Sequence, residues 1–375
     1  MMKGKKSAAG DETYRVTTLE LFFDLVFVFT ITELTGLLKN DISFTGLYKV
    51  LLLLIILWWM YSGYAWLTNT VAPTGIVRKL LILCGMGGFF IMALSTPEVF
   101  RNGGIFWGLG YLIVIIVHGS LYSIVTKNIL RIIPFNIIAA LLVITASFLD
   151  GTAVYACWSA AALIPIITTY IIPAAGKFSL RPAHIVERHG LLMLIAFGES
   201  VIAIGHGFKN VPIEAELIGA ALTGLALIAL FWLLYFAGNE ELTEKILTEA
   251  DDAQRTKLVM SGYFYAHIPM IAGVVCTSVG ISDGIHHFFD KLELYTAAIL
   301  AGGVSLFLFG NVIFRSLIGL KPNRFRICAL ILVLFTTALG VNISSSVQIF
   351  AEILIISMTV IFEKYCGHSA LKTYE

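Results

Sequence analysis

Charged residues and cysteines are both scarce in this sequence of 375 residues. Charged residues make up 13% of it and hydrophobic residues 58%, whereas a soluble domain carries roughly 25% charged and 45–50% apolar residues. This composition excludes a water-soluble globular protein. The five cysteines stand at unrelated spacings and form no C-x-x-C pair, so we interpret them as small apolar residues within helices.

The sequence also lacks a basic block, a zinc-ligand spacing and a nucleotide-binding loop, and its net charge is only +1. We therefore predict no nucleic-acid partner and no cofactor. The N-terminal residues are basic and polar, but the apolar run that follows carries Glu20, Asp24 and Glu33, and no small-residue cleavage site comes after it. We expect this run to remain as the first helix and not to be a cleaved signal peptide.

Apolar stretches that could cross a bilayer, which takes about 20 residues each, recur along the whole chain. They predict an all-α integral membrane protein with twelve transmembrane helices. The predicted spans are 17–38, 47–68, 77–97, 105–126, 131–149, 153–173, 189–207, 214–238, 258–282, 292–313, 323–342 and 346–364.

The lysines and arginines fall mostly on one side of these spans. The termini and the loops after even-numbered helices hold 20 of the 25 Lys and Arg residues, and the opposite loops hold 5. Positive residues favour the cytosolic side, so we predict cytosolic termini and a multi-pass protein of the cytoplasmic (inner) membrane. The longest cytosolic loop, 239–257, has helical spacing and should form a short surface helix.

The two halves of the predicted bundle share a weak pattern. Helix one has Asp24 within an apolar run, and helix seven has Glu199; Trp58 and Tyr61 of helix two match Trp232 and Tyr235 of helix eight. Because each half has an even number of helices, the repeats would be parallel.

This pattern divides the chain into three predicted parts. Residues 1–16 form a cytosolic segment, 17–176 the first six-helix repeat and 177–375 the second repeat, which includes the 239–257 loop.

Acidic and basic side chains inside these spans are the candidate functional residues, because a charge at the bilayer centre costs roughly 2.5–3.5 kcal/mol. Glu20 and Asp24 stand at i and i+4 on one helix face. They form either a proton or cation site, or a structural pair bonded to the backbone or to an arginine.

Arg188, Glu199 and His206 are spaced to lie along one face of helix seven, from its cytosolic mouth to its outer end. This stripe suits ion or proton movement, or electrostatic packing in which Arg188 neutralises a carboxylate of another helix. For Glu199 we predict that it faces a central cavity shared with Asp24.

Several histidines complete the set. His267 precedes Pro269, which frees a backbone carbonyl that the imidazole could bind. Metal ligation near helix seven lacks a third local ligand, so we predict no metal site. The predicted pathway residues are Glu20, Asp24, His118, Arg188, Glu199, His206 and His267, with His184, Glu187 and His189 as a secondary cluster before helix seven.

Four strings of the sequence, LELFFDLVFVF (19–29), HIVERHG (184–190), GES (198–200) and HIPMIAG (267–273), closely resemble the bacterial low temperature requirement protein A family, LtrA. The resemblance covers nearly the whole chain and the order of its motifs. It implies a bacterial membrane protein that is linked by family name to growth in the cold, and it implies no particular reaction.

The architecture also resembles that of the potassium channels of endosomes and lysosomes and their bacterial relatives. These have six-helix repeats whose first helix carries an Arg followed by a Phe-Ser-Asp string. Here Arg15 precedes a Phe-Phe-Asp string that ends at Asp24, and Arg188 precedes a Phe-Gly-Glu string that ends at Glu199. The serine is missing and the spacings differ between halves, so this analogy concerns fold more than function.

The deep acids and the duplicated architecture favour a transporter or channel for an ion or small solute. Two alternatives remain open: a membrane sensor or scaffold without cargo, and a membrane-embedded redox enzyme. The sequence shows no recognisable set of catalytic residues, which argues against an enzyme. The expected partners are the lipid bilayer and a small ion or solute, and a homo-oligomer is left open.

Overall fold

The computed structural model describes residues 15–371, apart from 72–73, 102, 125–126, 172–179, 208–213, 237–238 and 322. All regular elements in these described residues are helical, as predicted. The proposed boundary between the repeats at 176 and most of the N-terminal segment 1–16 lie outside the described residues. The helices of the first half are α1 Thr18–Asn40, α2 Phe44–Thr70, α3 Ile76–Ser95, α4 Gly104–Ser123, α5 Ile133–Ala146 and α6 Thr152–Ile171. Those of the second half are α7 Pro182–His206, α8 Ala215–Phe236, α9 Asn239–Glu249, α10 Asp252–Val259, α11 His267–His286, α12 Leu294–Ile318, α13 Arg324–Phe335, α14 Thr337–Asn342 and α15 Ser345–Leu371.

Within the described residues, eleven helices are long and apolar enough to cross a membrane, and Thr152–Thr168 forms a shorter apolar helix. These twelve segments follow the predicted spans in order. The surface of the bundle is apolar as well: large side chains such as Phe106, Ile116 and Leu354 are more than half exposed. An apolar exterior around buried polar groups is the arrangement that lipid favours, so the chain is a polytopic membrane protein.

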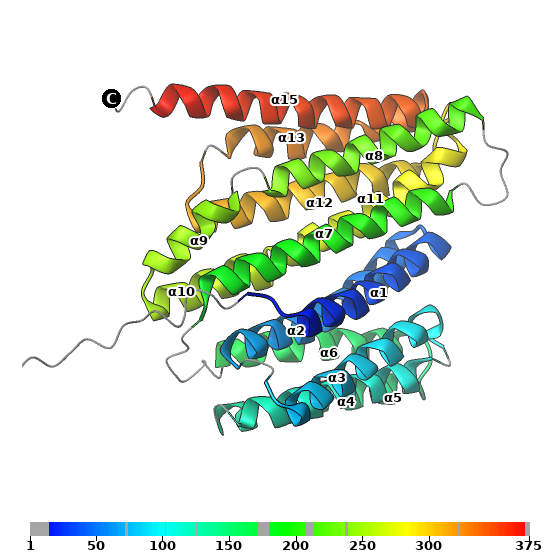
Figure 1. Ribbon diagram of the computed structural model, residues 1–375. Coiled ribbons are helices and arrows are strands. Elements are labelled where there is room, and N and C mark those ends of the chain that lie inside the picture. The colour runs from blue at the N-terminus through cyan, green and yellow to red at the C-terminus, as the bar shows by residue number, and fades with distance from the viewer. Residues whose placement is uncertain are drawn as a thin grey trace, which may run out of the picture.

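The helices form two groups that meet along four of them. In Figure 1, α1 to α6 occupy the lower part of the view and α7 to α15 the upper part. Contacts between the groups are made by α1 and α2 on one side and by α7 and α11 on the other. Polar groups on the sides of these four helices that face the other group therefore lie at the centre of the molecule.

The first helices of the two groups run in the same direction. Near its start, α7 contacts the start of α1, where the Glu187 carboxylate accepts a hydrogen bond from the Val16 amide at 3.1 Å. Further along, Glu199 is close to Thr32 and Glu33 of α1. This parallel contact is compatible with a parallel repeat, which remains a prediction.

Two predicted details differ from the structure. Helix α7 begins at Pro182, seven residues before the predicted span, because Pro at the first helical position is favourable. The cluster from His184 to His189 is therefore helical. The predicted surface helix of 239–257 is observed as α9 and the start of α10, and a π-helical turn, Met260–Tyr265, joins α10 to α11.

Candidate functional site

A fully buried arginine connects α7 to two carboxylates of α1. The Arg188 guanidinium donates from Nη1 to Glu20 Oε1 at 3.1 Å and from Nη2 to Asp24 Oδ1 at 3.0 Å. It also donates to the Thr68 hydroxyl of α2. All three ionic side chains are at most 1% exposed. The i,i+4 spacing on α1 places both acids where one planar guanidinium can reach them.

Glu20 is held by the start of its own helix as well. Thr17 caps α1, and its amide and hydroxyl both donate to Glu20 Oε2, at 2.9 and 2.8 Å. The other oxygen, Oε1, lies 2.9 Å from Nε2 of the buried His184. The Nδ1 atom of His184 is 3.1 Å from the Asn69 amide of α2. Every oxygen of Glu20 is thus engaged, and three helices are joined.

Asp24 is less completely satisfied. Its Oδ1 accepts from the Tyr61 hydroxyl at 3.0 Å in addition to Arg188, but its buried Oδ2 has no hydrogen-bond partner among the described residues. The rings of Phe23 and Tyr61 lie 5.6 Å from the guanidinium carbon of Arg188. Asp24 therefore presents one oxygen that could accept a proton or contact a bound ion.

The charges of this network do not balance by themselves. Glu20 and Asp24 bring two negative charges, whereas Arg188 brings one positive charge that it keeps at all ordinary pH values. One negative charge is left over in a buried site, where an unpaired charge is costly. A proton on His184 or on a carboxyl group, or a bound cation, must neutralise it.

A second buried cluster of histidines adjoins the network. His267 is bonded to the Tyr235 hydroxyl at 2.9 Å and to the Gly262 carbonyl at 3.0 Å; this carbonyl is in the π-helical turn and is not the one that Pro269 frees. His189 lies 5.4 Å from the ring of His267, and Trp58 stacks on His267 at 6.0 Å. The two histidines and Tyr235 form a polar chain beside Tyr61.

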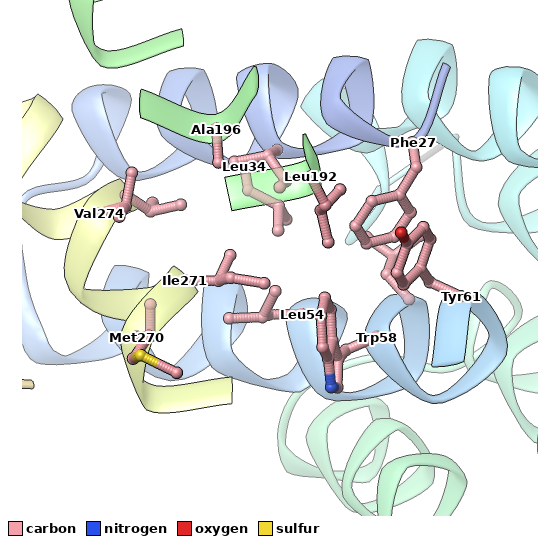
Figure 2. Close-up of a cluster of buried hydrophobic side chains, with 14 of the residues drawn as sticks. Phe27, Leu34, Leu54, Trp58, Tyr61, Leu192, Ala196, Met270, Ile271 and Val274 are labelled. Carbon is pink, nitrogen blue, oxygen red and sulfur yellow. The ribbon is translucent and has the colours of Figure 1, made fainter. Parts of the chain in front are cut away.

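Apolar side chains close the interface on the other side of these clusters. Figure 2 shows Phe27 and Leu34 of α1, Leu192 of α7 and Ile271 of α11 packed together next to Tyr61 and Trp58. These residues are fully buried or nearly so. The polar clusters near the start of α7 are thus sealed from the Glu199 end of the same helix.

A pocket of about 400 Å³ opens at the start of α7, the end of α8 and the start of α9. It is rich in acid: Glu187, Glu240, Glu241 and Glu244 line it, with Arg15. A smaller pocket next to it also touches Glu240 and is lined by Tyr235, which bonds His267. The acidic pocket therefore leads toward the histidine cluster.

The three residues of the predicted stripe of helix seven differ in burial. Arg188 is completely buried, while His206 is exposed at the end of α7. Glu199 is buried and approaches Thr32 and Glu33 of α1, two turns beyond Asp24. The linings of four pockets among the described residues include neither Glu199 nor Asp24, and the cavity that these two acids should share stays a prediction.

His118 also stands apart from the network. It is buried on α4 between Tyr64 and Tyr122, with ring centroids 5.3 and 5.6 Å away. A Cβ atom at Gly63 would come within 3.1 Å of its Nε2 atom, so a close approach of α2 and α4 holds the imidazole. No group of three or more His, Cys, Asp or Glu side chains that could hold a metal is found in the described part of the chain.

The site also contains residues that the sequence analysis did not assign to the predicted pathway. Tyr61, Thr68 and Asn69 come from α2, and Tyr235 from α8. A signal was present for α2, because polar groups at positions 61 and 68 are two turns apart on one face of an apolar helix. No local pattern indicated that this face would meet Arg188.

The family model for the bacterial low temperature requirement A protein (LtrA) matches residues 15–361. The chain belongs to the LtrA family. A relative in Rhizobium meliloti (strain 1021), named uncharacterized protein RA0937, is 26% identical over 312 residues, which cover 78% of this chain and 75% of the relative. For this LtrA protein, the matched segment includes the whole network from Thr17 to Arg188, together with both histidines of the adjoining cluster.

Proposed function

We propose that this LtrA protein moves an ion or a small solute across the cytoplasmic membrane, as a transporter or channel. Glu20 and Asp24 bind the charge that moves or is coupled to the movement. The observation that carries this proposal is the uncompensated negative charge of the network, which only a proton or a cation can neutralise.

The position of the network supports the same function. It lies where the two groups of helices meet, so relative movement of α1 and α7 would change the surroundings of both acids. On one side the acidic pocket leads toward the histidine cluster that adjoins the network, and on the other the apolar layer of Figure 2 lies between the network and Glu199. Because Glu20 and Asp24 are both buried, movement of the two helix groups would have to expose them to one face of the membrane at a time, as alternating access requires.

The test is reconstitution of the wild-type protein and of Asp24→Asn into liposomes, with dyes that report protons, sodium and potassium. Asn keeps the shape of Asp24 and its bonds to Tyr61 and Arg188, but it cannot titrate. We expect flux in the wild type, and at least a tenfold loss in Asp24→Asn at unchanged protein yield.

Asp41→Asn is the matched control, because Asp41 follows α1 and pairs with Lys49 at 2.9 Å away from the network. It should keep wild-type flux. Wild-type vesicles that leak no faster than protein-free vesicles under all three gradients would overturn the proposal. If Asp24→Asn does not accumulate in the membrane, Asp24 is a structural partner of Arg188.

A further inference from the structure

A third carboxylate, Glu352 on α15, is completely buried far along the chain from the network. Its Oε1 atom lies 3.0 Å from the Thr336 hydroxyl and 3.1 Å from the Gln348 amide nitrogen. Both partners are neutral. Its Oε2 atom is buried without a hydrogen-bond partner among the described residues, as is the Oε1 atom of Gln348.

A break in the helical segment before α15 places the Thr336 hydroxyl beside Glu352. Thr336 separates α13 from α14, and its amide is bonded to the Val333 carbonyl at 2.9 Å. Its hydroxyl lies 2.6 Å from the same carbonyl. On the other side, Gly340 leaves the space that Gln348 occupies, because a Cβ atom there would overlap the Gln348 amide oxygen.

No charged group of the described residues offsets a charge on Glu352. The helices packed against α15 are α8, α11, α12, α13 and α14. The first four carry charged side chains or histidines near their ends, and α14 carries none. None of these groups, nor Glu363 and Lys364 on α15 itself, interacts with Glu352. The groups are Glu216, His267, Asp283, His286, Arg315, Arg324 and Arg326.

The hydrogen bonds of the Thr336 hydroxyl indicate the protonation state of Glu352. The Thr336 hydroxyl has one hydrogen and two oxygen neighbours, Val333 O and Glu352 Oε1. If it donates to the shorter contact, the Val333 carbonyl, its oxygen faces Glu352 as an acceptor. A carboxylic acid with its proton on Oε1 donates to that oxygen, so both hydrogens of the chain from Glu352 through Thr336 to Val333 have an acceptor. An ionised Glu352 would stay buried without a cation, which is costly.

We propose that Glu352 is a proton-binding site, in which the protonated carboxyl group donates to Thr336, which donates in turn to the Val333 carbonyl. The proton can leave only when water or a cation reaches the acid, so its exchange reports opening of the contact between α15 and the α13–α14 break. This site stands independently of the transport proposal.

The experiment is infrared spectroscopy of the full-length protein in lipid at neutral pH, on the wild type, Glu352→Gln, Thr336→Val and Glu216→Gln. We expect a carbonyl stretch of a protonated carboxylic acid in the wild type that is lost in Glu352→Gln. Thr336→Val, which removes the acceptor of the proton, should shift the same band. Glu216→Gln removes an exposed carboxylate of α8 and should leave the band unchanged.

Two outcomes would overturn the proposal. One is a spectrum in which Glu352→Gln loses only ionised-carboxylate bands, or in which neither Glu352→Gln nor Thr336→Val changes the protonated band. The other is a wild-type band that disappears when sodium or potassium chloride replaces choline chloride at constant pH, because a metal cation would then displace the proton. If Glu352→Gln does not fold, the comparison of wild type with Thr336→Val decides alone.

Discussion

At the scale of single residues, Arg188 stands out because it is completely buried and forms ion pairs with both Glu20 and Asp24. It neutralises acids of another helix, which is one of the two interpretations that the sequence left open. Removing one member of a buried ion cluster leaves an uncompensated charge, which costs about 3–5 kcal/mol. We expect Arg188→Ala to lower the unfolding temperature in detergent strongly, or to abolish accumulation, because Glu20 and Asp24 would face each other without a cation.

Arg15→Ala provides the control for this prediction. The Arg15 side chain is 65% exposed and reaches Glu187 only at 3.9 Å, and an exposed pair of this kind is worth about 0–1 kcal/mol. Arg188→Lys should be intermediate, since an ammonium keeps the positive charge but lacks the rigid planar fork of donors that reaches both carboxylates at once. Equal unfolding temperatures for Arg188→Ala and Arg15→Ala would show that the buried network does not stabilise the fold.

The sequence identified the charged residues of this network, but it did not indicate which of them contact one another. Glu20 and Asp24 stood out because an i,i+4 acid pair is unusual in an apolar helix. Arg188 was placed at the membrane edge because the polar string before it lowers the local hydropathy, so the helix was expected to start at residue 189. The contact that defines the site joins residues more than 160 positions apart, and no local pattern encodes such a contact. Glu352 was missed altogether.

At the scale of helices, the close pair α11 and α12 depends on particular glycines. A Cβ atom at Gly303 would lie 2.5 Å from the backbone nitrogen of Thr277, whereas one at the neighbouring Gly302 would have nothing within 4 Å. Backbone cannot move aside as a flexible side chain can. We expect Gly303→Ala to destabilise the protein by about 1–3 kcal/mol through overpacking, and Gly302→Ala to be neutral, in thermal unfolding of the purified proteins.

The two variants add the same methyl group to the same helix, so any difference between them measures the contact with α11. If Gly302→Ala were the more damaging, the observed packing of these helices would be wrong. The sequence alone does not distinguish the two glycines, since it does not show which side of α12 faces α11.

Helix positions themselves were largely predictable, because about 20 apolar residues are a strong and local signal. The break between α13 and α14 was not. It falls at Thr336, with no proline or glycine beside it, and depends on bonds to Val333 and Glu352 that only the folded structure provides.

At the scale of the whole molecule, the parallel contact of α1 and α7 constrains the topology. If both helices begin at the same face, the chain must cross the membrane an even number of times between those two starting points. The first five spans, the fifth of which runs from Ile129 to Ala146, are long enough to cross, so the apolar helix Thr152–Thr168 within α6 must cross as well. This argument and the 20-to-5 distribution of positive residues agree on twelve crossings, with cytosolic termini as the prediction.

Single cysteines at Lys321 and Lys291 test this topology on a cysteine-free background. Both lysines are exposed and lie at opposite ends of α12. A membrane-impermeant maleimide added to intact cells should label Lys291→Cys and spare Lys321→Cys, and the second should react only after the membrane is opened. The asymmetry follows from the positive-inside bias, because Lys321 belongs to the lysine- and arginine-rich set. Labelling of Lys321→Cys from outside would contradict the twelve-helix arrangement, because a missing or additional crossing before α12 reverses both positions together.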